Sequence, residues 1–471
     1  MRISIFLLSI LTAGTALAKD MIPTPPDFPV IGQLEQRLYE EMVKKPGREE
    51  ANLATVNTQA FFKAVIEEHG LKLFGGPQLG CVTDTSAKVW VRTPYAATVH
   101  LQCGETKSPS ITTSSKNDFT AILDLKGLKA NTSYTYQVFV NDEPALAKPP
   151  SFKTAPAAGG GGRFSIAFGG GARYNHPKEY MWETMASFNP AATLLLGDNL
   201  YIDNGNHRGM QRMYYYRRQL RPEYQTLSAT SAMYSIWDDH DFHNNDSAGG
   251  LHPTKPDYKI PVWKVFQENW VNPGYGEPPE NPGCYYSFNI GDVDFFMTDG
   301  RYYRDFKKDT MLGPVQKKWL INALKQSTAT FKVICSGTLW TEHADKGGKD
   351  SWWGVREERE EVLSTIDKHN LGGVLLLSAD RHRTDVYELH RPNGYTLYEF
   401  ETSKLTNDHT HPTKPKALFS YNKGNYFGLI DFDLDKKAPQ FTFKCITIDR
   451  EEVYALTIKR SQLEKGPSVN A

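Results

Sequence analysis

A run of four glycines at positions 159–162 divides the chain into two parts whose hydrophobic patterns require different folds. Before this run, apolar and polar residues alternate with a period of two, as in residues 87–92 (AKVWVR) and 134–140 (YTYQVFV). Such alternation predicts half-buried strands. After the run, short apolar segments alternate with helical ones, which predicts an α/β core. Because glycine-rich stretches act as linkers, we expect a domain boundary here.

The part before the glycines, residues 76–156, is expected to form a β-sandwich. Short strands separated by turn residues are typical of that architecture. Residues 128–136 (LKANTSYTY) look like the loop and penultimate strand of a fibronectin type III module. Cys81 and Cys103 both fall on predicted strands, but five cysteines in 471 residues are no disulfide framework, so a bridge between them stays an open alternative.

The N-terminus has the layout of a secretory signal peptide. A basic residue at position 2 precedes an apolar run at 3–11, and Ala-Leu-Ala at 16–18 provides a cleavage site. We therefore expect residues 1–18 to be removed after Ala18 and the mature protein to be secreted or periplasmic. The next segment, 19–75, is expected to be Pro-rich and then helical.

Composition excludes several functional classes. Lys+Arg and Asp+Glu both number 54, so the formal net charge is zero and no basic field would attract nucleic acid. The mature chain has no apolar run near 18 residues, so no membrane span is expected. Gly-x-Ser-x-Gly, Walker-type and His-Glu-x-x-His motifs are absent from the sequence.

The part after the glycines, residues 163–471, is expected to form an α/β core, in which ligands bind at the carboxyl ends of strands. Apolar strands are predicted at 164–168, 192–196, 332–335 and 373–377, with a helix at 316–324. From residue 386 the alternation returns. It predicts antiparallel strands that finish the second sheet, at 395–400, 428–434, 441–448 and 453–458.

One polar cluster follows Trp237 and carries the strongest chemical signal. Four aspartates, two histidines and two asparagines lie within the nine positions 238–246. Neighbouring carboxylates repel one another unless a cation neutralises them. The cluster therefore predicts a metal site, and the alternative is a solvated acidic loop.

Two further clusters also follow predicted strands. Asp198 comes after 192–196, with Tyr201 and Asp203 as further oxygen donors, and the alternative for this carboxylate is a helix N-cap. Asp380 and His382 come after 373–377, and their i, i+2 spacing places both side chains on one face if strand geometry continues. The alternative is a hydrogen-bonded loop pair. Together the three clusters predict one shared metal centre.

The order of these motifs resembles that of the alkaline phosphatase D-type (PhoD-like) metallophosphoesterases. The resemblance covers about residues 76–400, and its most specific part is Trp-Asp-Asp-His with the following Asn-Asn. The matching segments are a glycine turn at 169–171, Gly-Asp-x-x-Tyr at 197–201, Trp-Asp-Asp-His at 237–240, the blocks 295–305 and 312–320, Asp-Ser-Trp-Trp-Gly at 350–354, and Ala-Asp-x-His at 379–382.

This resemblance implies a metallophosphatase-like α/β fold of the α+β type, a four-layer αββα sandwich preceded by the fibronectin III-like β-sandwich. It implies hydrolysis of small phosphate mono- or diesters with two or more metal ions. His240 would be catalytic and face the substrate phosphate, and Arg301 would bind substrate. The metal ligands implied are Asp198, Tyr201, Asp239, Asn245, Asp380 and His382.

Gly171 departs from the family pattern. In members whose metal site includes ferric iron, the first strand ends in Ser-Cys and the thiolate binds the iron, whereas glycine offers no ligand. A centre of oxygen donors with one histidine fits Ca²⁺ or Mn²⁺ best, with Mg²⁺ and Zn²⁺ as further options. Iron is therefore doubtful.

Two other functions remain open. The same centre could hydrolyse another ester, such as a sulfate ester. Alternatively, the chain could be a surface binding protein that has lost activity together with the first-strand ligand. Retention of Asp198, Asp239, Asp380 and His382 argues against that loss, and stoichiometric metal would distinguish an enzyme from a binding module.

Overall fold

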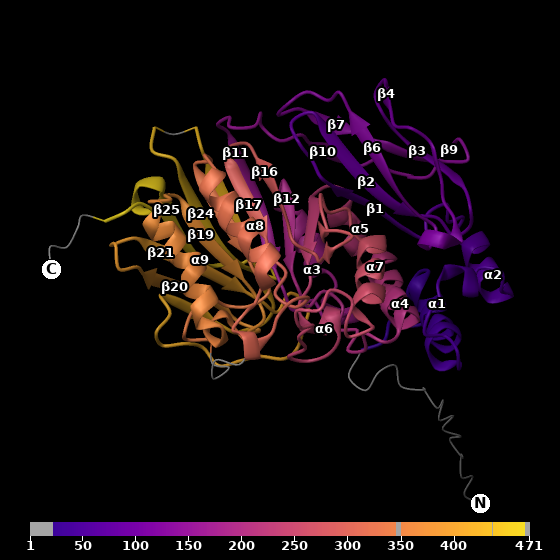
Figure 1. The fold of residues 1–471 in the computed structure, drawn as a ribbon. Helices are drawn as coiled ribbons and strands as arrows, with labels where there is room; N and C mark the ends of the chain where they lie inside the picture. Colours follow the sequence, from indigo (N-terminus) through magenta and orange to yellow (C-terminus); the bar gives the residue numbers. More distant parts are fainter. Residues whose placement is uncertain (1–21, 345–349, 436, 467–471) are drawn as a thin grey trace, which may run out of the picture.

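The computed structural model describes residues 22–344, 350–435 and 437–466 (Figure 1). Two β-sheets form its centre, and an all-β region and two N-terminal helices lie at one end of them. The expected signal peptide, residues 1–18, falls outside the described residues. None of the described helices is long and apolar enough to cross a membrane.

The N-terminal segment is helical where the spacing predicts it. Its elements are α1 (Ile31–Tyr39), a π-helical turn (Glu40–Lys44) and α2 (Ala60–Glu68). Leu34, Leu38 and Met42 lie on one face and are fully buried. Because α1 contacts α4 (Arg208–Gln219), this segment packs against the catalytic part of the chain.

The region between residues 75 and 153 consists of short strands. They are β1 (Gly75–Gly80), β2 (Ser86–Arg92), β3 (Thr98–Cys103), β4 (Thr106–Lys107), β5 (Ile111–Thr112), β6 (Thr120–Lys126), β7 (Ser133–Thr135), β8 (Gln137–Val140), β9 (Glu143–Pro144) and β10 (Ser151–Lys153). One sheet has the order β1-β2-β6, a second has β4-β3-β8-β9 with β5 beside β3, and β7 pairs with β10. Cys81 and Cys103 both carry free thiols in this structure.

The single strand predicted at 134–140 is wrong. The strand is interrupted at Tyr136, so that β7 pairs with β10 while β8 pairs with β3. The buried hydroxyl of Tyr136 donates to the carbonyl of Ala229 at 2.9 Å. The period of two continues through the break, so the sequence pattern could not reveal that the strand changes partners.

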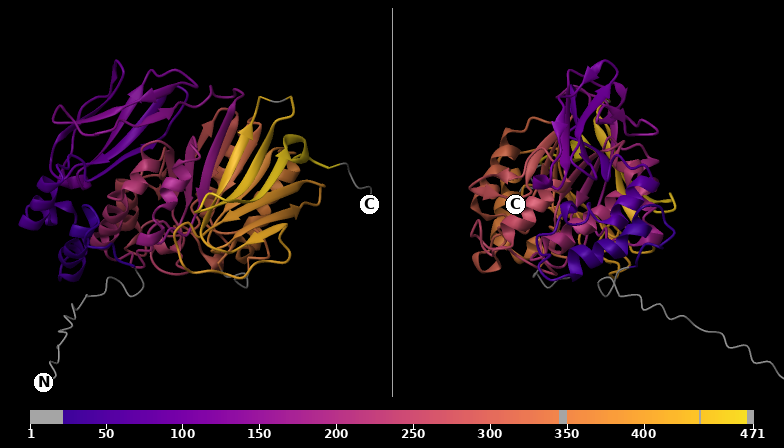
Figure 2. Two further views of the ribbon diagram at one scale, coloured as in Figure 1. Left: turned by 180° about the vertical axis from the view of Figure 1, so that it is seen from behind. Right: turned by 90° about the vertical axis from the view of Figure 1, so that its right-hand side faces the viewer.

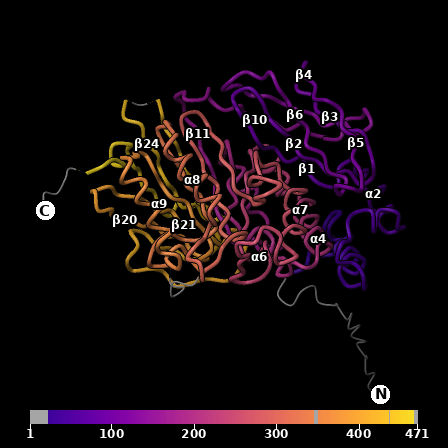
Figure 3. The backbone as a smooth tube through the Cα atoms, viewed as in Figure 1, coloured from indigo at the N-terminus to yellow at the C-terminus, as the bar shows by residue number. Residues whose placement is uncertain are grey.

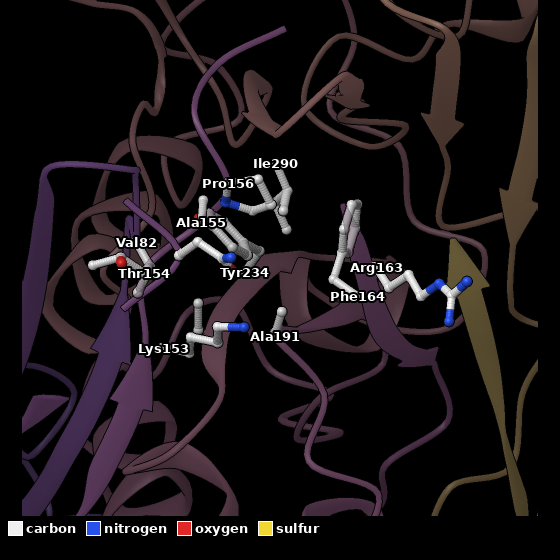
Figure 4. A pocket seen from close by; sticks show the side chains of 12 residues that line it. Val82, Lys153, Thr154, Ala155, Pro156, Arg163, Phe164, Ala191, Tyr234 and Ile290 are labelled. Atoms are coloured by element: carbon white, nitrogen blue, oxygen red, sulfur yellow. The ribbon is translucent and has the colours of Figure 1, made fainter. Parts of the chain in front are cut away.

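A small cavity of about 40 Å³ marks the junction between the all-β region and the catalytic part (Figure 4). Thr154 and Pro156, which precede the glycines, and Phe164 and Tyr234, which follow them, are among the residues that line it. A space of this size holds a water molecule or two and leaves no room for a substrate. The junction therefore joins the two parts by close packing.

The first central sheet has six strands. In order across the sheet they are β13 (Ala232–Ile236), β12 (Ala192–Leu196), β11 (Arg163–Gly169), β23 (Tyr426–Asp433), β24 (Gln440–Thr447) and β25 (Glu452–Lys459). β11, β12 and β13 run parallel, and every residue of β12 and β13 is buried. Continuous burial agrees with the unbroken apolar runs of the sequence.

The second central sheet has seven strands. In order they are β16 (Tyr286–Ile290), β17 (Val293–Met297), β18 (Phe331–Cys335), β19 (Val374–Ser378), β21 (Thr396–Thr402), β20 (Thr384–His390) and β22 (Phe419–Tyr421). β17, β18, β19 and β21 run parallel. A separate short hairpin pairs β14 (Gly276–Glu277) with β15 (Asn281–Pro282).

The prediction that all strands after residue 386 finish the second sheet is wrong. β20, β21 and β22 do so, but β23 returns to the first sheet and pairs with β11, and β24 and β25 follow it (Figure 3). Without β23, the apolar β11 would be an edge strand with unpaired backbone groups. Alternation identifies strands but does not specify their partners.

Phenylalanine side chains fill the space between the two sheets. Phe331 of β18 lies 5.7 Å from Phe432 of β23 and 5.5 Å from Phe441 of β24, measured between ring centroids. Phe400 of β21 lies 4.7 Å from Phe443 of β24. The two sheets therefore form a sandwich with an aromatic core.

Helices cover the sandwich unevenly. The remaining ones are α3 (Met181–Ala186), α5 (Pro222–Ser228), α6 (Asp239–Phe242), α7 (Lys259–Asn269), α8 (Gly313–Gln326) and α9 (Arg356–Lys368). α8 and α9 lie over the outer face of the seven-stranded sheet (Figure 1). Seen from behind, no described helix lies in front of β24 and β25 (Figure 2). The polar Thr442 and Lys444 of β24 are partly exposed there.

Candidate active site

Three strands end at one pocket. β12, β13 and β19 end at Leu196, Ile236 and Ser378, and the residues that follow each of them supply polar side chains. The pocket has a volume of about 510 Å³ and is lined by Arg173, Asp198, Tyr201, Asp203, His240, Asn245, Asp246, Asp380, Arg381, His382, Asn407, His409 and His411. The three clusters that the sequence analysis singled out therefore meet in space.

Asp198 lies at the bottom of this pocket and is 2% exposed. Its Oδ2 accepts a hydrogen bond from the Tyr201 hydroxyl at 2.9 Å, while its Oδ1 is buried with no hydrogen-bond partner among the described residues. Burial and the nearby charge of Asp239 raise the pKa of Asp198 well above its ordinary value. An orphaned buried carboxylate oxygen is what a bound cation would satisfy.

The short helix α6 brings the second acidic residue to Asp198. Asp238 caps its N-terminus, and Asp241 completes the capping box. The carboxylate of Asp241 also accepts hydrogen bonds from the backbone N–H groups of Asn199 (2.9 and 3.0 Å) and Leu200 (3.0 Å). These hydrogen bonds join the loop after β12 to the loop after β13. They thereby hold Asp239 of α6 near Asp198.

Two groups of acidic residues in the described part of the chain have metal-binding spacing. Asp198, Asp239 and His240 form one, and Asp239, Asp246 and Asp350 form the other, with one donor atom of each residue within 4.8 Å of those of its group. Asp239 belongs to both. The donors are mainly carboxylates, which suit hard divalent cations. These residues therefore fit a centre of more than one metal ion.

Arg301, predicted to bind substrate, does not line the pocket. It is completely buried and donates to Asp238 and, at 2.8 and 3.2 Å, to Asp350. Its Nη2 also lies 3.7 Å from Oδ1 of Asp239. The structure thus places this guanidinium beneath the acidic clusters, where it positions the carboxylates.

His240 is oriented by contacts on two sides. Its Nδ1 is hydrogen-bonded to the carboxylate of Asp203, and its ring stacks on Tyr201 with centroids 4.3 Å apart. Burial favours the neutral ring, but the charge of Asp198 and the hydrogen bond to Asp203, together with the charge of Asp239, outweigh it and raise the pKa of His240 to about 10. In the metal-free chain these contacts therefore favour the protonated imidazole.

Tyr201 links the acidic side of the pocket to His382. Its hydroxyl lies 2.9 Å from Nε2 of His382 and accepts from Nδ2 of Asn407 at 2.7 Å. Burial, and then the charge of Asp198, raise the pKa of Tyr201 well above its ordinary value. Burial also lowers the pKa of His382 well below its usual range. The contact thus joins a neutral phenol and a neutral imidazole.

Asp380 and His382 do not continue the strand as expected. β19 ends at Ser378, and both residues have left-handed backbones, with φ of +83° and +44°. Both side chains nevertheless line the pocket, because of the turn and not because of strand alternation. Asn245 also lines the pocket and is solvent-exposed.

Several pocket residues were not among the predicted site residues. They are Arg173, Asp246, Arg381, Asn407, His409 and His411. Arg173 lies over the ring of Tyr201, 5.8 Å from its centroid. The Asn-x-His-x-His spacing at 407–411 was a signal in the sequence, but it sits in a polar loop away from any predicted strand end.

Comparisons with known proteins identify a family that this chain resembles in sequence. The sequence model of the PhoD-like phosphatase family matches residues 166–443, and a domain of unknown function (DUF7800) matches residues 70–157. The chain is 24% identical over 319 residues to alkaline phosphatase D of Bacillus subtilis (strain 168). That match spans 57% of this chain and 54% of the relative, so the chain covers about half the length of the curated protein.

Solved structures show a similar fold. A structure of PhoD has a TM-score of 0.68 at 18% identity and covers 83% of this chain and 89% of its own. The purple acid phosphatase PPD1 from yellow lupin (Lupinus luteus) has a TM-score of 0.61 at 12% identity and covers 81% of this chain and 74% of its own. At these identities the likeness concerns the fold.

Proposed function

The chain belongs to the PhoD-like phosphatase family, whose sequence model matches more than half of it, and we propose that it is an exported, metal-dependent hydrolase of phosphate mono- or diesters. The observation that carries the proposal is the pairing of two buried carboxylates at strand ends: Asp198, which lines the pocket, and Asp239, which lies beside Asp198 but is not among the residues that line the pocket. Buried carboxylates with raised pKa values at a cleft are typical of functional sites.

The residues proposed to hold the metal ions are Asp198, Tyr201, Asp239, Asn245, Asp380 and His382, with Asp246 and Asp350 as further carboxylates. The proposed ions at the carboxylate clusters are Ca²⁺ or Mn²⁺, with Mg²⁺ and Zn²⁺ as options, because these clusters offer mainly oxygen donors. Divalent ions at such a site neutralise phosphoryl oxygens and lower the pKa of water. With Gly171 at the turn after β11, we expect little iron and a colourless protein.

His240 is proposed as the general acid. Its ring lines the pocket, and its contacts with Asp203 and Tyr201 fix its orientation. A protonated imidazole there can donate its proton to the leaving oxygen of the ester. Asp203 would then stabilise the protonated ring until the proton leaves.

Arg173 and Arg381 are proposed to bind the substrate phosphate. Both line the pocket, and their guanidinium groups suit phosphate oxygens. Arg301 is proposed as a positioning residue, since it is buried and paired with Asp238 and Asp350. Arg301 is thus proposed to act through these carboxylates and not by contacting the substrate.

The layout of the whole chain is part of the proposal. We propose a signal peptide at 1–18, a fibronectin III-like sandwich at 76–156 and a catalytic domain at 163–471. The two sheets packed through phenylalanines, with α8 and α9 over the outer face of the seven-stranded one, support the metallophosphatase-like αββα arrangement. N-terminal sequencing of the exported protein should find Lys19 first, and an intact Met1 would contradict export by cleavage.

The test is hydrolysis of a phosphate monoester, a phosphate diester and a sulfate ester by the purified protein. Each is assayed as purified, after chelation, and after return of Ca²⁺, Mn²⁺, Mg²⁺, Zn²⁺ or iron singly. We expect phosphate ester hydrolysis that chelation abolishes and a divalent ion restores. Activity unchanged by chelation, or confined to the sulfate ester, would refute the proposal.

A further inference from the structure

Three imidazoles meet at one end of the pocket, and the motif after β19 accounts for only one of them. His382 follows β19, whereas His409 and His411 lie on the loop after β21. One ring nitrogen of each residue lies within 4.8 Å of the other two. The ring centroids are 4.7 Å (His409–His411), 5.2 Å (His382–His409) and 5.6 Å (His382–His411) apart. Such spacing would allow the three imidazoles to bind one shared ligand.

Neighbouring side chains contact two of these rings, those of His382 and His411, whereas His409 is exposed. Nε2 of His382 contacts the Tyr201 hydroxyl at 2.9 Å, and its Nδ1 is buried with no hydrogen-bond partner among the described residues. Arg381 donates to Nδ1 of His411 at 3.4 Å. Asn407, bonded to the Tyr201 hydroxyl, anchors the start of the histidine loop. The rings of His382 and His411 are therefore preorganised.

Backbone hydrogen bonds tie the histidine loop, residues 403–411, to the glycine turn after β11. The N–H groups of Lys404 and Leu405 donate to the carbonyl of Gly170 at 3.0 Å, and that of Asn407 donates to Gly171 at 3.2 Å. Gly171 has φ of +66°, and a Cβ there would lie 2.8 Å from the nitrogen of Lys404. The glycine thus permits the close approach that carries the two histidines to His382.

We propose that His409 and His411 join His382 of the proposed centre to form a three-imidazole site for a divalent ion of the Zn²⁺ or Co²⁺ type in the pocket. Imidazole nitrogens suit such ions, whereas Ca²⁺ and Mg²⁺ take oxygen donors. Three histidines beside an open pocket also match the donor set of a zinc site that keeps a position for substrate or water. The site rests on the proposed function for its use in hydrolysis and shares His382 with the ligands proposed there, whereas His409 and His411 belong to neither carboxylate group.

The experiment uses Co²⁺ as a visible probe. The full mature protein is stripped of metal, saturated with Ca²⁺ to fill the carboxylate clusters, and titrated with Co²⁺ while its visible absorption is followed. The test variant is His409→Asn/His411→Asn. The matched control is His390→Asn, an exposed histidine on β20 outside the pocket. We expect the unmodified protein and the control to bind one Co²⁺ that Zn²⁺ displaces, and the double variant to bind it on the order of 100-fold or more weakly.

Unchanged cobalt bands in the double variant would overturn the site. The site is also overturned if that variant keeps its cobalt affinity but loses inhibition by inorganic phosphate, because the histidines would then bind the anion. Asp239→Asn, titrated in parallel, separates this inference from the proposed function. If Asp239→Asn keeps its cobalt bands but loses hydrolysis, both the imidazole site and the carboxylate centre are supported. If it keeps both its cobalt bands and full hydrolysis, the imidazole site is supported and the carboxylate centre is overturned.

Discussion

Two buried regions of this protein are rich in charged side chains, and they differ in how the charges are matched. Around α4, each of four arginines faces a glutamate. The pairs are Arg212–Glu268 (2.9 Å), Arg217–Glu35 (2.9 Å), Arg218–Glu179 (2.8 Å) and Arg221–Glu223 (2.5 Å). At the pocket, Asp198 instead faces Asp239, with Asp238, Asp246 and Asp350 nearby.

The difference shows whether each region neutralises its own buried charges or requires cations from solution to do so. Around α4 the chain itself offsets the cost of burying each charge, and the Arg217–Glu35 pair fastens the N-terminal segment to the catalytic part. At the pocket, Arg301 is surrounded by several acids, and burial with the charge of Asp239 raises the pKa of Asp198. We infer that the arginine region serves stability and that the pocket is completed by cations from solution.

Asp198→Asn should produce the largest effect. An amide keeps the shape of the side chain but removes the negative charge, so we expect hydrolysis to fall by at least about 10²–10³-fold, the cost of losing one preorganised electrostatic group. Turnover and bound metal are measured together. The matched control is Asp142→Asn, which also has a left-handed backbone (φ +63° against +54°) but lies exposed in the all-β region. Equal activity of the two variants would contradict the claim that the charge of Asp198 is needed at the pocket.

His240→Ala should lower turnover by roughly 10²–10⁴-fold, which is the usual contribution of a proton-transfer group. Because the aspartates remain, metal content should stay near that of the unmodified protein. Steady-state kinetics and metal analysis on the same sample check this. If the loss of turnover matched a loss of metal, His240 would be a ligand and not the acid.

Arg217→Met should act on stability and not on chemistry. It leaves Glu35 buried without its partner, which costs about 3–5 kcal/mol in the free energy of unfolding. Urea unfolding measures this, and activity per folded molecule should be unchanged. The control is Lys255→Met, which removes an exposed pair with Asp257 and should change stability by about 0.5 kcal/mol or less. Similar costs for both variants would contradict the contrast between matched and unmatched regions.

The metal-free protein should lose stability as the pH rises. Burial raises the pKa of Asp238 to about 7, despite Arg301, and that of Asp241 to about 6. Both folded values exceed the unfolded value of about 3.9, so above pH 4 the folded chain holds protons that the unfolded chain releases. We expect the free energy of unfolding to fall by several kcal/mol, on the order of 5 kcal/mol, between pH 4 and 7 in chelator.

Adding a divalent ion should reduce this decline, because a cation held at Asp198 and Asp239 favours the ionised form of the neighbouring Asp238 and Asp241. Urea unfolding at several pH values, with chelator or with metal, makes the comparison. A chelated protein whose stability rises with pH over this range would show that the acids are already neutralised by the chain.

Much of the fold follows from local sequence pattern. The strand predicted at 192–196 is β12, and the four glycines at 159–162 separate the all-β region from the catalytic part. The pairing of β23 with β11 was missed, because alternation shows which residues face inward but not which strand lies alongside. The partner is decided by the need to cover an apolar edge.

The site was predictable where chemistry is concentrated in the sequence. Aspartates directly after apolar strands identified Asp198 and Asp239, because strand ends gather at one edge of a sheet. Arg301 and His411 show the limit. Whether an arginine faces solvent or a buried aspartate depends on residues far away in the sequence, and so does the arrival of a loop histidine beside His382.

The most direct test of the central claim is the metal content of the purified protein, measured together with turnover in the unmodified chain and in Asp239→Asn. Asp239 belongs to both carboxylate groups, so its loss should remove metal from each. We predict at least two equivalents of divalent ion in the active unmodified protein, and a large loss of both metal and turnover in the variant. Full turnover in protein that contains only trace metal would contradict the account.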